Sequence, residues 1–353
     1  MLLPHKQLLQ METIAKQDQD YGKLHGKTVV ITGGTSGVGR AAAEAFALAG
    51  CNVVVAARGQ QGLDETVSLV RDLGAVALGV PTDVSNAEEV KNLAQQALQF
   101  NGRIDIWVNN AGVMASGKFE DIPVESMDQV VKTNLLGFMH GAYNVLPIFK
   151  RQGEGVLINN VSIGGYMPAP YSTAYSSTKF GIRGMVEGLQ GEVSNEPNIH
   201  IVGLYPGIQR STGNMHSAKY SGLDFKIPPF STDPRELAAQ MVEAAINPKK
   251  SIVTDGYAAT MKFLYGLFPK TIINTASAVM RLTMKPHAET NTDGNVREPS
   301  DDPHRIYGEL ALPVPSEKTK TLLMMGVGVG LGFLLTASSG KKKSKKKKNQ
   351  LAK

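Results

Sequence analysis

This chain has a single cysteine and no pair of histidines at metal-binding spacing. Cys51 is the single cysteine, so neither an intramolecular disulfide framework nor a cysteine-rich zinc module can be built. The seven histidines show neither HxxxH nor HxH spacing, which argues against a dedicated metal site. The opening MLLPHKQLLQ has no long apolar run and no small-residue cleavage site, so a secretory signal is not expected.

A basic face is also missing, although the net charge is +6 at pH 7. Eight lysines and no acidic residue fall within 341–353, and +6 less these eight charges leaves residues 1–340 at −2. DNA binding needs a basic face on the folded domain, so a nucleic-acid partner is not expected. With 42% hydrophobic and 19% charged residues, the 353 residues suffice for one large α/β domain or two small ones.

Short apolar runs alternate with helix-like stretches after a lead-in of residues 1–25. The runs are typical of strands buried on both faces of a parallel sheet. They are Thr28–Ile31, Asn52–Ala56, Ala75–Val80, Ile104–Val108, Val156–Asn159, Ile199–Leu204 and Ser251–Thr254. Helical stretches such as Arg40–Ala49, Asn86–Phe100 and Val124–Lys150 separate them. The alternation predicts an α/β domain over residues 26–284, with a Rossmann-type, doubly wound parallel sheet of about seven strands and helices on both faces.

A glycine-rich loop, TGGTSGVGR, lies directly between the first predicted strand and the first predicted helix. Unpaired N–H groups and the positive end of the dipole at a helix N-terminus attract phosphate. Glycine lets a pyrophosphate approach the backbone closely. A tight turn without a ligand is the alternative interpretation, and the position of the loop favours a nucleotide.

The GxxxGxG spacing resembles the TGxxxGxG motif of the short-chain dehydrogenase/reductase family. Further motifs of that family follow at the ends of predicted strands, with Asp83–Val84, the NNAG of residues 109–112 and the turn Pro206–Gly207. The resemblance covers about residues 26–255 and implies a nicotinamide dinucleotide coenzyme. It implies binding by Thr32, Gly33, Thr35, Ser36, Gly37, Val38, Gly39, Arg58, Asp83, Val84, Asn110, Ala111, Gly112, Tyr175, Lys179, Pro206 and Gly207.

Ala57 and Arg58 stand at the end of the second predicted strand, where an NAD enzyme usually carries an acid. An acid would repel a 2′-phosphate, whereas an arginine can pair with it through two hydrogen bonds. We therefore predict NADP(H) rather than NAD(H), with Arg58 on the 2′-phosphate and Ser36 as a second contact. A solvated charge at the strand end is the alternative interpretation of Arg58.

Tyr175 and Lys179 form a YxxxK, which places a phenol and an ammonium on one helix face. An ammonium and an oxidised nicotinamide both favour the phenolate, which brings the tyrosine pKa toward working pH. With Ser162 and with Asn134 of TNLLG, the pair resembles the family's catalytic Ser–Tyr–Lys–Asn set. The resemblance implies that Tyr175 exchanges the proton and Ser162 hydrogen-bonds the oxyanion. Lys179 would also hold the nicotinamide ribose, and Asn134 would position a water that links Lys179 to solvent.

The predicted function is NADP(H)-dependent hydride transfer to or from a carbonyl or secondary alcohol. Segment 208–231, which covers the substrate in the resembling family, is rich in apolar residues, so a lipophilic substrate is expected. Packing of the lid alone is the other interpretation of that segment. A membrane-associated NADP(H)-binding scaffold or sensor without turnover is the alternative function, and an epimerase or dehydratase is a third. The resemblance also implies a homodimer or tetramer.

The composition changes beyond the predicted strands. Residues 257–282 are apolar with scattered basic residues and predict helices that lie across the domain or against a membrane. Residues 285–319 are typical of a linker or surface arm. The apolar segment 320–340 is about 30 Å long as a helix, just enough for a bilayer, and the lysines of 341–353 attract anionic lipid. A spanning, an interfacial and a soluble tail stay open. We expect membrane association with the catalytic domain facing the cytosol.

Overall fold

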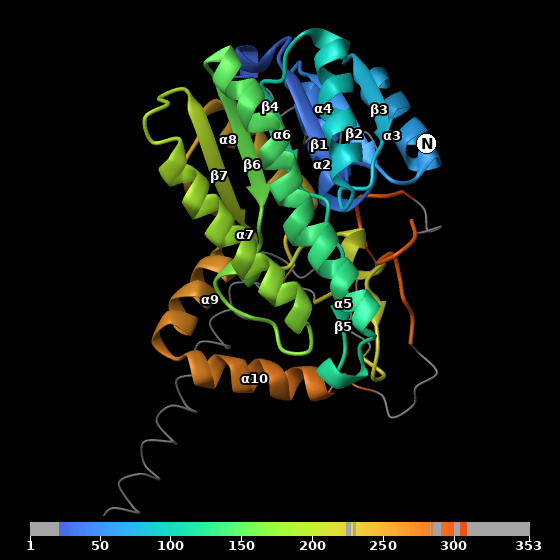
Figure 1. Ribbon diagram of the computed structural model, residues 1–353. Coiled ribbons are helices and arrows are strands. Elements are labelled where there is room, and N and C mark those ends of the chain that lie inside the picture. Colours follow the sequence, from blue (N-terminus) through green and yellow to red (C-terminus); the bar gives the residue numbers. More distant parts are fainter. Residues whose placement is uncertain are drawn as a thin grey trace, which may run out of the picture. The chain divides into compact units, whose positions relative to one another are not determined.

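Seven parallel strands form the main sheet of the computed structural model (Figure 1), in the order β3-β2-β1-β4-β6-β7-β9. Their bounds are β1 (Thr28–Thr32), β2 (Asn52–Ala57), β3 (Ala77–Pro81), β4 (Ile106–Asn109), β6 (Gly155–Asn160), β7 (Ile199–Tyr205) and β9 (Ser251–Val253). Each apolar run of the sequence is one of these strands, so the predicted sheet is confirmed. The structure describes residues 21–223, 227–228, 231–282, 284, 291–299 and 304–308.

Helices cover both faces of the sheet because successive residues of a strand point to opposite faces and both sets are apolar. On one face, Val29 and Ile31 pack with Phe46 in a core that α2, α3 and α8 share. On the other face, Val30 packs with Trp107 among residues of α4, α6 and α7. The bounds are α2 (Gly37–Leu48), α3 (Gln60–Asp72), α4 (Ala87–Asn101), α6 (Gly137–Gln152), α7 (Thr173–Glu192) and α8 (Pro234–Ile246).

The strand order reverses direction between β1 and β4, and a crevice opens at such a point in a doubly wound sheet. Thr32 at the end of β1 ties the two strands together. Its Oγ1 donates to the Val108 carbonyl at 3.2 Å and accepts the Asn110 and Ala111 N–H groups at 3.0 and 3.2 Å. The glycine-rich loop and the NNAG motif therefore lie side by side at the carboxyl edge of the sheet.

The predicted helix Val124–Lys150 is present and contains a π-helical turn. It divides into α5 (Val124–Val131), a π-helical turn (Lys132–Leu136) and α6. A short parallel pair, β5 (Ala115–Ser116) and β8 (Ala218–Lys219), lies outside the main sheet.

Residues 257–282 form two helices, α9 (Gly256–Leu267) and α10 (Pro269–Leu282), and Figure 1 shows them below the carboxyl edge of the sheet. Within the described part of the chain, no helix combines the length and apolarity that a bilayer crossing requires. The segment 320–340 and the tail 341–353, on which the membrane prediction rests, lie outside the described residues, as do residues 1–20 of the lead-in.

Candidate active site

Ser162, Tyr175 and Lys179 meet around Gly164. A Cβ atom on Gly164 would lie 3.4 Å from Tyr175 Cε1, 3.5 Å from Ser162 Oγ and 3.6 Å from Lys179 Cβ. The Ser162 and Tyr175 hydroxyl groups are hydrogen-bonded to each other. The turn after β6 and the first turns of α7 thus bring together the three residues that the sequence separates.

Ser162 has a strained backbone. Its φ of 101° and ψ of 155° lie in a region that side chains rarely adopt. The conformation is held because its N–H donates to the Leu204 carbonyl at 3.3 Å and its Oγ accepts the Gly164 N–H at 3.1 Å. Strain of this kind clusters at functional sites, and nothing in the local sequence predicts it.

Burial determines the pKa values of the catalytic pair in the protein itself. It raises the pKa of Tyr175, and the hydrogen bond with Ser162 opposes that shift. Lys179 is 5% exposed, and burial lowers its pKa to about 7. Its Nζ donates to the Asn160 carbonyl at 3.2 Å and lies 5.4 Å from the centroid of the Tyr175 ring. The expected lowering of the Tyr175 pKa is therefore absent from the protein alone and stays a prediction for the site with oxidised nicotinamide.

Asn134 lies in the π-helical turn and is fully buried. Its Oδ1 accepts the Val113 N–H at 2.8 Å, and its Nδ2 donates to the Val113 carbonyl at 2.9 Å and to Thr178 Oγ1 at 3.3 Å. Asn134 thus ties the loop after β4 to α7 directly beside Lys179. π-helical turns are frequent at functional sites, but the sequence pattern does not distinguish this turn from regular α-helix. The water-positioning role of Asn134 stays a prediction.

The glycine-rich loop has the close packing that a pyrophosphate cradle needs. Gly33 has a φ of +64°, and a Cβ there would lie 2.8 Å from Ala111 Cα. A Cβ on Gly39 would collide with the Gly33 carbonyl and lie 2.6 Å from Asn110 Nδ2. Ser36 is the N-cap of α2, whose first turn carries no acidic residue. These residues fit a dinucleotide, since an anion could approach the N-terminus of α2 without meeting a side chain of like charge.

The remaining predicted coenzyme residues lie along the same edge of the sheet. Asp83 follows β3, and its carboxylate accepts the Ser85 N–H at 2.9 Å and the Ser85 hydroxyl at 2.8 Å. Pro206 and Gly207 follow β7, and the Pro206 carbonyl accepts the Ile163 N–H at 2.8 Å. The other members of the set, which complete this edge, are Thr35, Gly37, Val38, Val84 and Gly112.

Arg58 is held by a part of the chain that sequence reasoning did not connect with it. Its guanidinium donates to the carbonyls of Asn295, Arg297 and Glu298 at 2.6, 2.8 and 3.2 Å. Burial lowers the pKa of Arg58, while the negative charges of Asp83 and Glu298 oppose that shift. Arg58 is thus a half-buried group whose two terminal nitrogens both donate hydrogen bonds, which contradicts its interpretation as a solvated charge.

These carbonyls belong to what we call the C-terminal arm, residues 291–299 and 304–308 (orange-red in Figure 1). The arm also reaches the glycine-rich loop, where the Arg305 carbonyl accepts the Gly37 N–H at 3.0 Å. One guanidinium nitrogen of Arg40 donates to the His304 carbonyl. Residues 285–319 were expected to be a linker or surface arm, and the described parts are an arm that contacts both predicted phosphate-binding groups.

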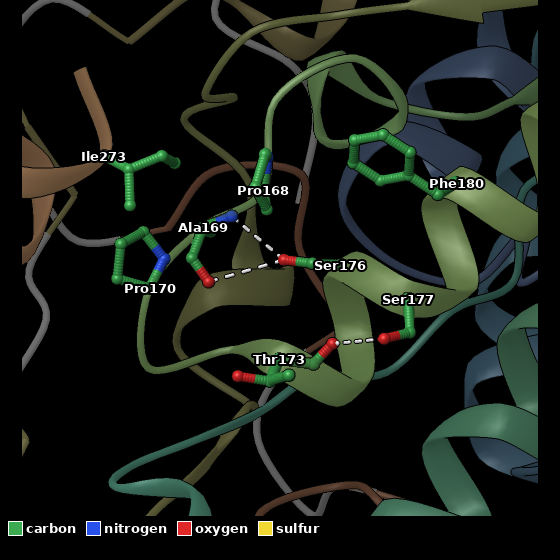
Figure 2. Close-up of a pocket in the computed structure, with 8 residues that line it drawn as sticks. All are labelled: Pro168, Ala169, Pro170, Thr173, Ser176, Ser177, Phe180 and Ile273. Atoms are coloured by element: carbon green, nitrogen blue, oxygen red, sulfur yellow. Dashed lines mark hydrogen bonds between the residues drawn. The ribbon is translucent and has the colours of Figure 1, made fainter. Parts of the chain in front are cut away.

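An open cavity of about 350 Å³ was not predicted from the sequence. Figure 2 draws the residues that line it. The cavity lies between the loop that precedes α7, α7 itself and Ile273 of α10. Its lining comprises Pro168, Ala169, Pro170, Thr173, Ser176, Ser177, Phe180 and Ile273. Within the predicted lid, by contrast, Tyr220, Leu223 and Ile227 are buried, so for these residues the packing interpretation holds.

The chain is similar to several known proteins. Residues 27–221 match the family model of the short chain dehydrogenases. The uncharacterized oxidoreductase YxnA of Bacillus subtilis (strain 168) is 30% identical over 300 residues, which cover 84% of this chain and 83% of that protein. The ketoacyl reductase HetN of a Nostoc species is 31% identical over 233 residues, 66% of this chain and 79% of that protein. A crystal structure from Sinorhizobium meliloti 1021, of a provisionally assigned short-chain alcohol dehydrogenase, superposes with a TM-score of 0.59 at 26% identity, covering 67% of this chain and 98% of the other.

Proposed function

Because the chain belongs to the short-chain dehydrogenase family and is an oxidoreductase of that type, we propose that it moves hydride between NADP(H) and a lipophilic carbonyl compound or secondary alcohol. The observation that carries the proposal is the buried meeting of Ser162, Tyr175 and Lys179 at the edge of the sheet that also bears the glycine-rich loop. The alternative of a scaffold without turnover leaves this intact catalytic set without a role.

The nicotinamide coenzyme would supply or accept the hydride when it is bound, and side chains of the protein would donate or accept the proton. The Tyr175 hydroxyl holds the proton that is exchanged with the substrate oxygen. Ser162, hydrogen-bonded to Tyr175, donates to the same oxygen as negative charge develops on it. Lys179 is buried beside the phenol, where its charged form favours the phenolate. Glycines 33 and 39, with the N-terminus of α2, would hold the pyrophosphate.

Preference for NADP(H) rests on Arg58 at the end of β2, since a guanidinium pairs well with a 2′-phosphate. The test is a titration of the purified full-length protein with NADPH and NADH, followed by nicotinamide fluorescence. Tighter binding of NADPH is expected. Tighter binding of NADH would overturn the role of Arg58, and failure to bind either coenzyme would overturn the proposed function.

We infer the lipophilic nature of the substrate from the cavity beside α7, whose lining includes Ser176, the residue after Tyr175, but none of Ser162, Tyr175 and Lys179. None of its eight lining residues is charged, and Pro168, Phe180 and Ile273 make its wall largely apolar. Such a lining discriminates against charged compounds because they would lose hydration without gaining a partner. Turnover of medium-chain or cyclic ketones and not of 2-oxo acids is the expected outcome of a substrate screen, and the reverse preference would refute this part of the proposal.

Membrane association is proposed as well, with the catalytic domain facing the cytosol. Residues 256–282 contain no acidic residue, and Lys262, Lys270 and Arg281 are basic. Their exposed apolar side chains are Phe263, Leu267, Phe268, Val279 and Leu282. An apolar surface with basic neighbours suits the interface of an anionic bilayer. Flotation of the full-length protein with anionic and not with neutral vesicles is expected, and no flotation with either would refute it.

A homodimer or tetramer is proposed from the outer face of the π-helical turn and α6. Leu136 of the turn and Met139 and Tyr143 of α6 are exposed there, and Tyr143 is 80% exposed. Exposed apolar patches of this kind mark association surfaces. Light scattering of the purified protein should give twice or four times the mass of one chain, and a monomer would contradict the proposal.

A further inference from the structure

The C-terminal arm gives its backbone carbonyls to the same groups that the proposed function assigns to the phosphates of NADP(H). Arg58 is the proposed partner of the 2′-phosphate, and three arm carbonyls accept hydrogen bonds from it. Gly37, at the start of α2, gives its N–H to the Arg305 carbonyl at 3.0 Å. A peptide carbonyl and a phosphate oxygen are acceptors of the same donors, so the arm and the coenzyme compete for these groups.

The hydrogen bonds that Arg58 already makes prevent its guanidinium from binding a phosphate through two N–H groups at once. A guanidinium grips a phosphate with two parallel N–H groups, either Nε with Nη2 or Nη1 with Nη2. Both pairs include Nη2, which donates to the Asn295 and Glu298 carbonyls at 2.6 and 3.2 Å. Nη1 donates to the Arg297 carbonyl at 2.8 Å. The bidentate contact with the 2′-phosphate therefore requires the arm to leave Arg58.

Two further groups of contacts hold the arm against the domain, so the arm has one defined bound position. Val296 is fully buried among Val113, Ala115 and Tyr220. Ile306 is also buried, and the Tyr307 hydroxyl, next to it, accepts from Arg235 Nη1 at 2.7 Å. Displacing the arm breaks these contacts. The coenzyme's apparent affinity is therefore its affinity for the open form multiplied by the fraction of molecules in which the arm is open.

We propose that the C-terminal arm is a strap that competes with NADP(H) for the adenosine end of the coenzyme groove, so that the coenzyme binds only after the arm has left Arg58 and Gly37. The inference rests on the proposed function and adds a regulatory element to it. By linkage, coenzyme binding releases the arm to the same degree that the arm weakens coenzyme binding. The 2′-phosphate makes the competition stronger for NADP(H) than for NAD(H).

A reversible lock tests the strap in the full-length protein. A Cβ on Gly59 would lie 3.6 Å from Pro299 Cβ, which is within the range that a disulfide bridges. Gly59 has φ −86° and ψ 124°, a conformation that cysteine adopts freely. The double variant Gly59→Cys/Pro299→Cys, oxidised, fixes the arm over Arg58, and dithiothreitol frees it. Cys51 is buried, and mass spectrometry of peptides identifies the bridge that forms.

The oxidised double variant should bind NADPH about tenfold or more weakly than the reduced form, and reduction should restore both binding and turnover. The single variants Gly59→Cys and Pro299→Cys should show no such response. Equal or tighter NADPH binding by the locked form would overturn the strap while leaving the proposed function intact. Failure of the wild-type and reduced proteins to bind either coenzyme would overturn the proposed function and the strap with it.

A second measurement holds whether or not the disulfide forms. Ile306 is buried in the docked arm, so trypsin should cut the Arg305–Ile306 bond of the wild-type protein slowly. NADPH should accelerate that cut severalfold, and NADH should do so less, because it lacks the 2′-phosphate. Protection of this bond by NADPH would show that the arm closes over the coenzyme, and would overturn competition.

Discussion

The two ends of the candidate site are built by different kinds of contact. At the catalytic end, Asn134, Ser162 and Lys179 find their polar partners between residues 113 and 204, within the core that packs α6 and α7 on the sheet. At the adenosine end, Arg58 and Gly37 find theirs in residues 295–305, more than two hundred positions further along the chain. The first set is preorganised by buried packing, and the second by carbonyl contacts that another acceptor can replace.

The residues of the catalytic end carry out the reaction, whereas those of the adenosine end control coenzyme binding. Groups that exchange a proton must be held in fixed geometry, because a small displacement costs rate. Groups that admit a coenzyme must be able to change partner. The catalytic end should therefore respond to substitution in turnover, and the adenosine end in coenzyme affinity. Substitutions at the two ends test that division, from the largest expected effect to the smallest.

Tyr175→Phe removes the hydroxyl that holds the exchanged proton and leaves the ring in place. Turnover should fall by about 10²–10⁴-fold, the usual contribution of general acid–base catalysis, while NADPH binding stays within about twofold. Steady-state kinetics and a coenzyme titration measure the two effects. Tyr166→Phe, on the loop between Ser162 and Tyr175, is the matched control and should keep its turnover. Normal turnover by Tyr175→Phe would remove Tyr175 from the mechanism.

Arg58→Ala acts at the other end of the groove. NADPH affinity should weaken by about 10–100-fold, because a charge-assisted contact with the 2′-phosphate is lost. NADH affinity should change by less than about threefold, and turnover at saturating coenzyme should be retained. Arg71→Ala is the control, because it removes an arginine of α3 whose guanidinium donates to the Ala77 carbonyl at 3.0 Å. An equal loss of affinity for NADPH and NADH would show that Arg58 does not bind the 2′-phosphate.

The same division explains which parts of the fold and of the site could be predicted from the sequence. Local patterns predict the strands, because Val29 and Val30 fill opposite faces whatever the rest of the chain does. They also locate Tyr175 and Lys179, since the YxxxK spacing fixes both on one side of a helix. The partners of Arg58 leave no local signal, because a carbonyl oxygen is the same in every residue. The polar, proline-containing composition of 285–319 suits a linker and a docked arm equally well.

Two features within the catalytic end were also beyond the sequence. The positive φ of Ser162 depends on the hydrogen bond of its N–H to β7, a strand some forty residues later. The π-helical turn around Asn134 places its amide against Val113 and Thr178, whereas helical periodicity alone predicts regular geometry. Apart from these two, Tyr220 of the predicted lid is buried in one cluster with Val296 of the arm, a contact that no local pattern predicts.

Lys179 links the catalytic end to the pH dependence of stability. An unfolded lysine keeps its proton to about pH 10, whereas burial lowers the pKa of Lys179 in the folded protein to about 7. Between these values the unfolded state binds more protons, so the unfolding free energy should rise with pH. From pH 7 to 8.5 the rise should approach about 1.4 kcal/mol per pH unit. Denaturant unfolding of wild type and Lys179→Met measures it, and equal slopes for both would contradict the burial of a titrating lysine.

The smallest expected effect compares two glycines on the helices of the catalytic end. Gly184 lies on the exposed face of α7, and a Cβ there would meet no described atom within 4 Å apart from the neighbouring residues and backbone of its own helix. Gly184→Ala should therefore stabilise the protein by about 0.5–1 kcal/mol through helix propensity. Gly141 of α6 is buried, and a Cβ there would collide with Asn109 Oδ1 and lie 2.7 Å from Trp107 Nε1. Gly141→Ala should therefore destabilise the protein by about 1–3 kcal/mol, since the core cannot shift to admit a methyl group. Thermal unfolding measures the change in stability of both variants. The two changes should have opposite signs if the buried side of the catalytic end is rigid and its exposed side is not. An unchanged stability of Gly141→Ala would mean that the core beneath the site can shift to admit a methyl group. The preorganisation of the site would then come from the hydrogen bonds of Asn134 and Ser162.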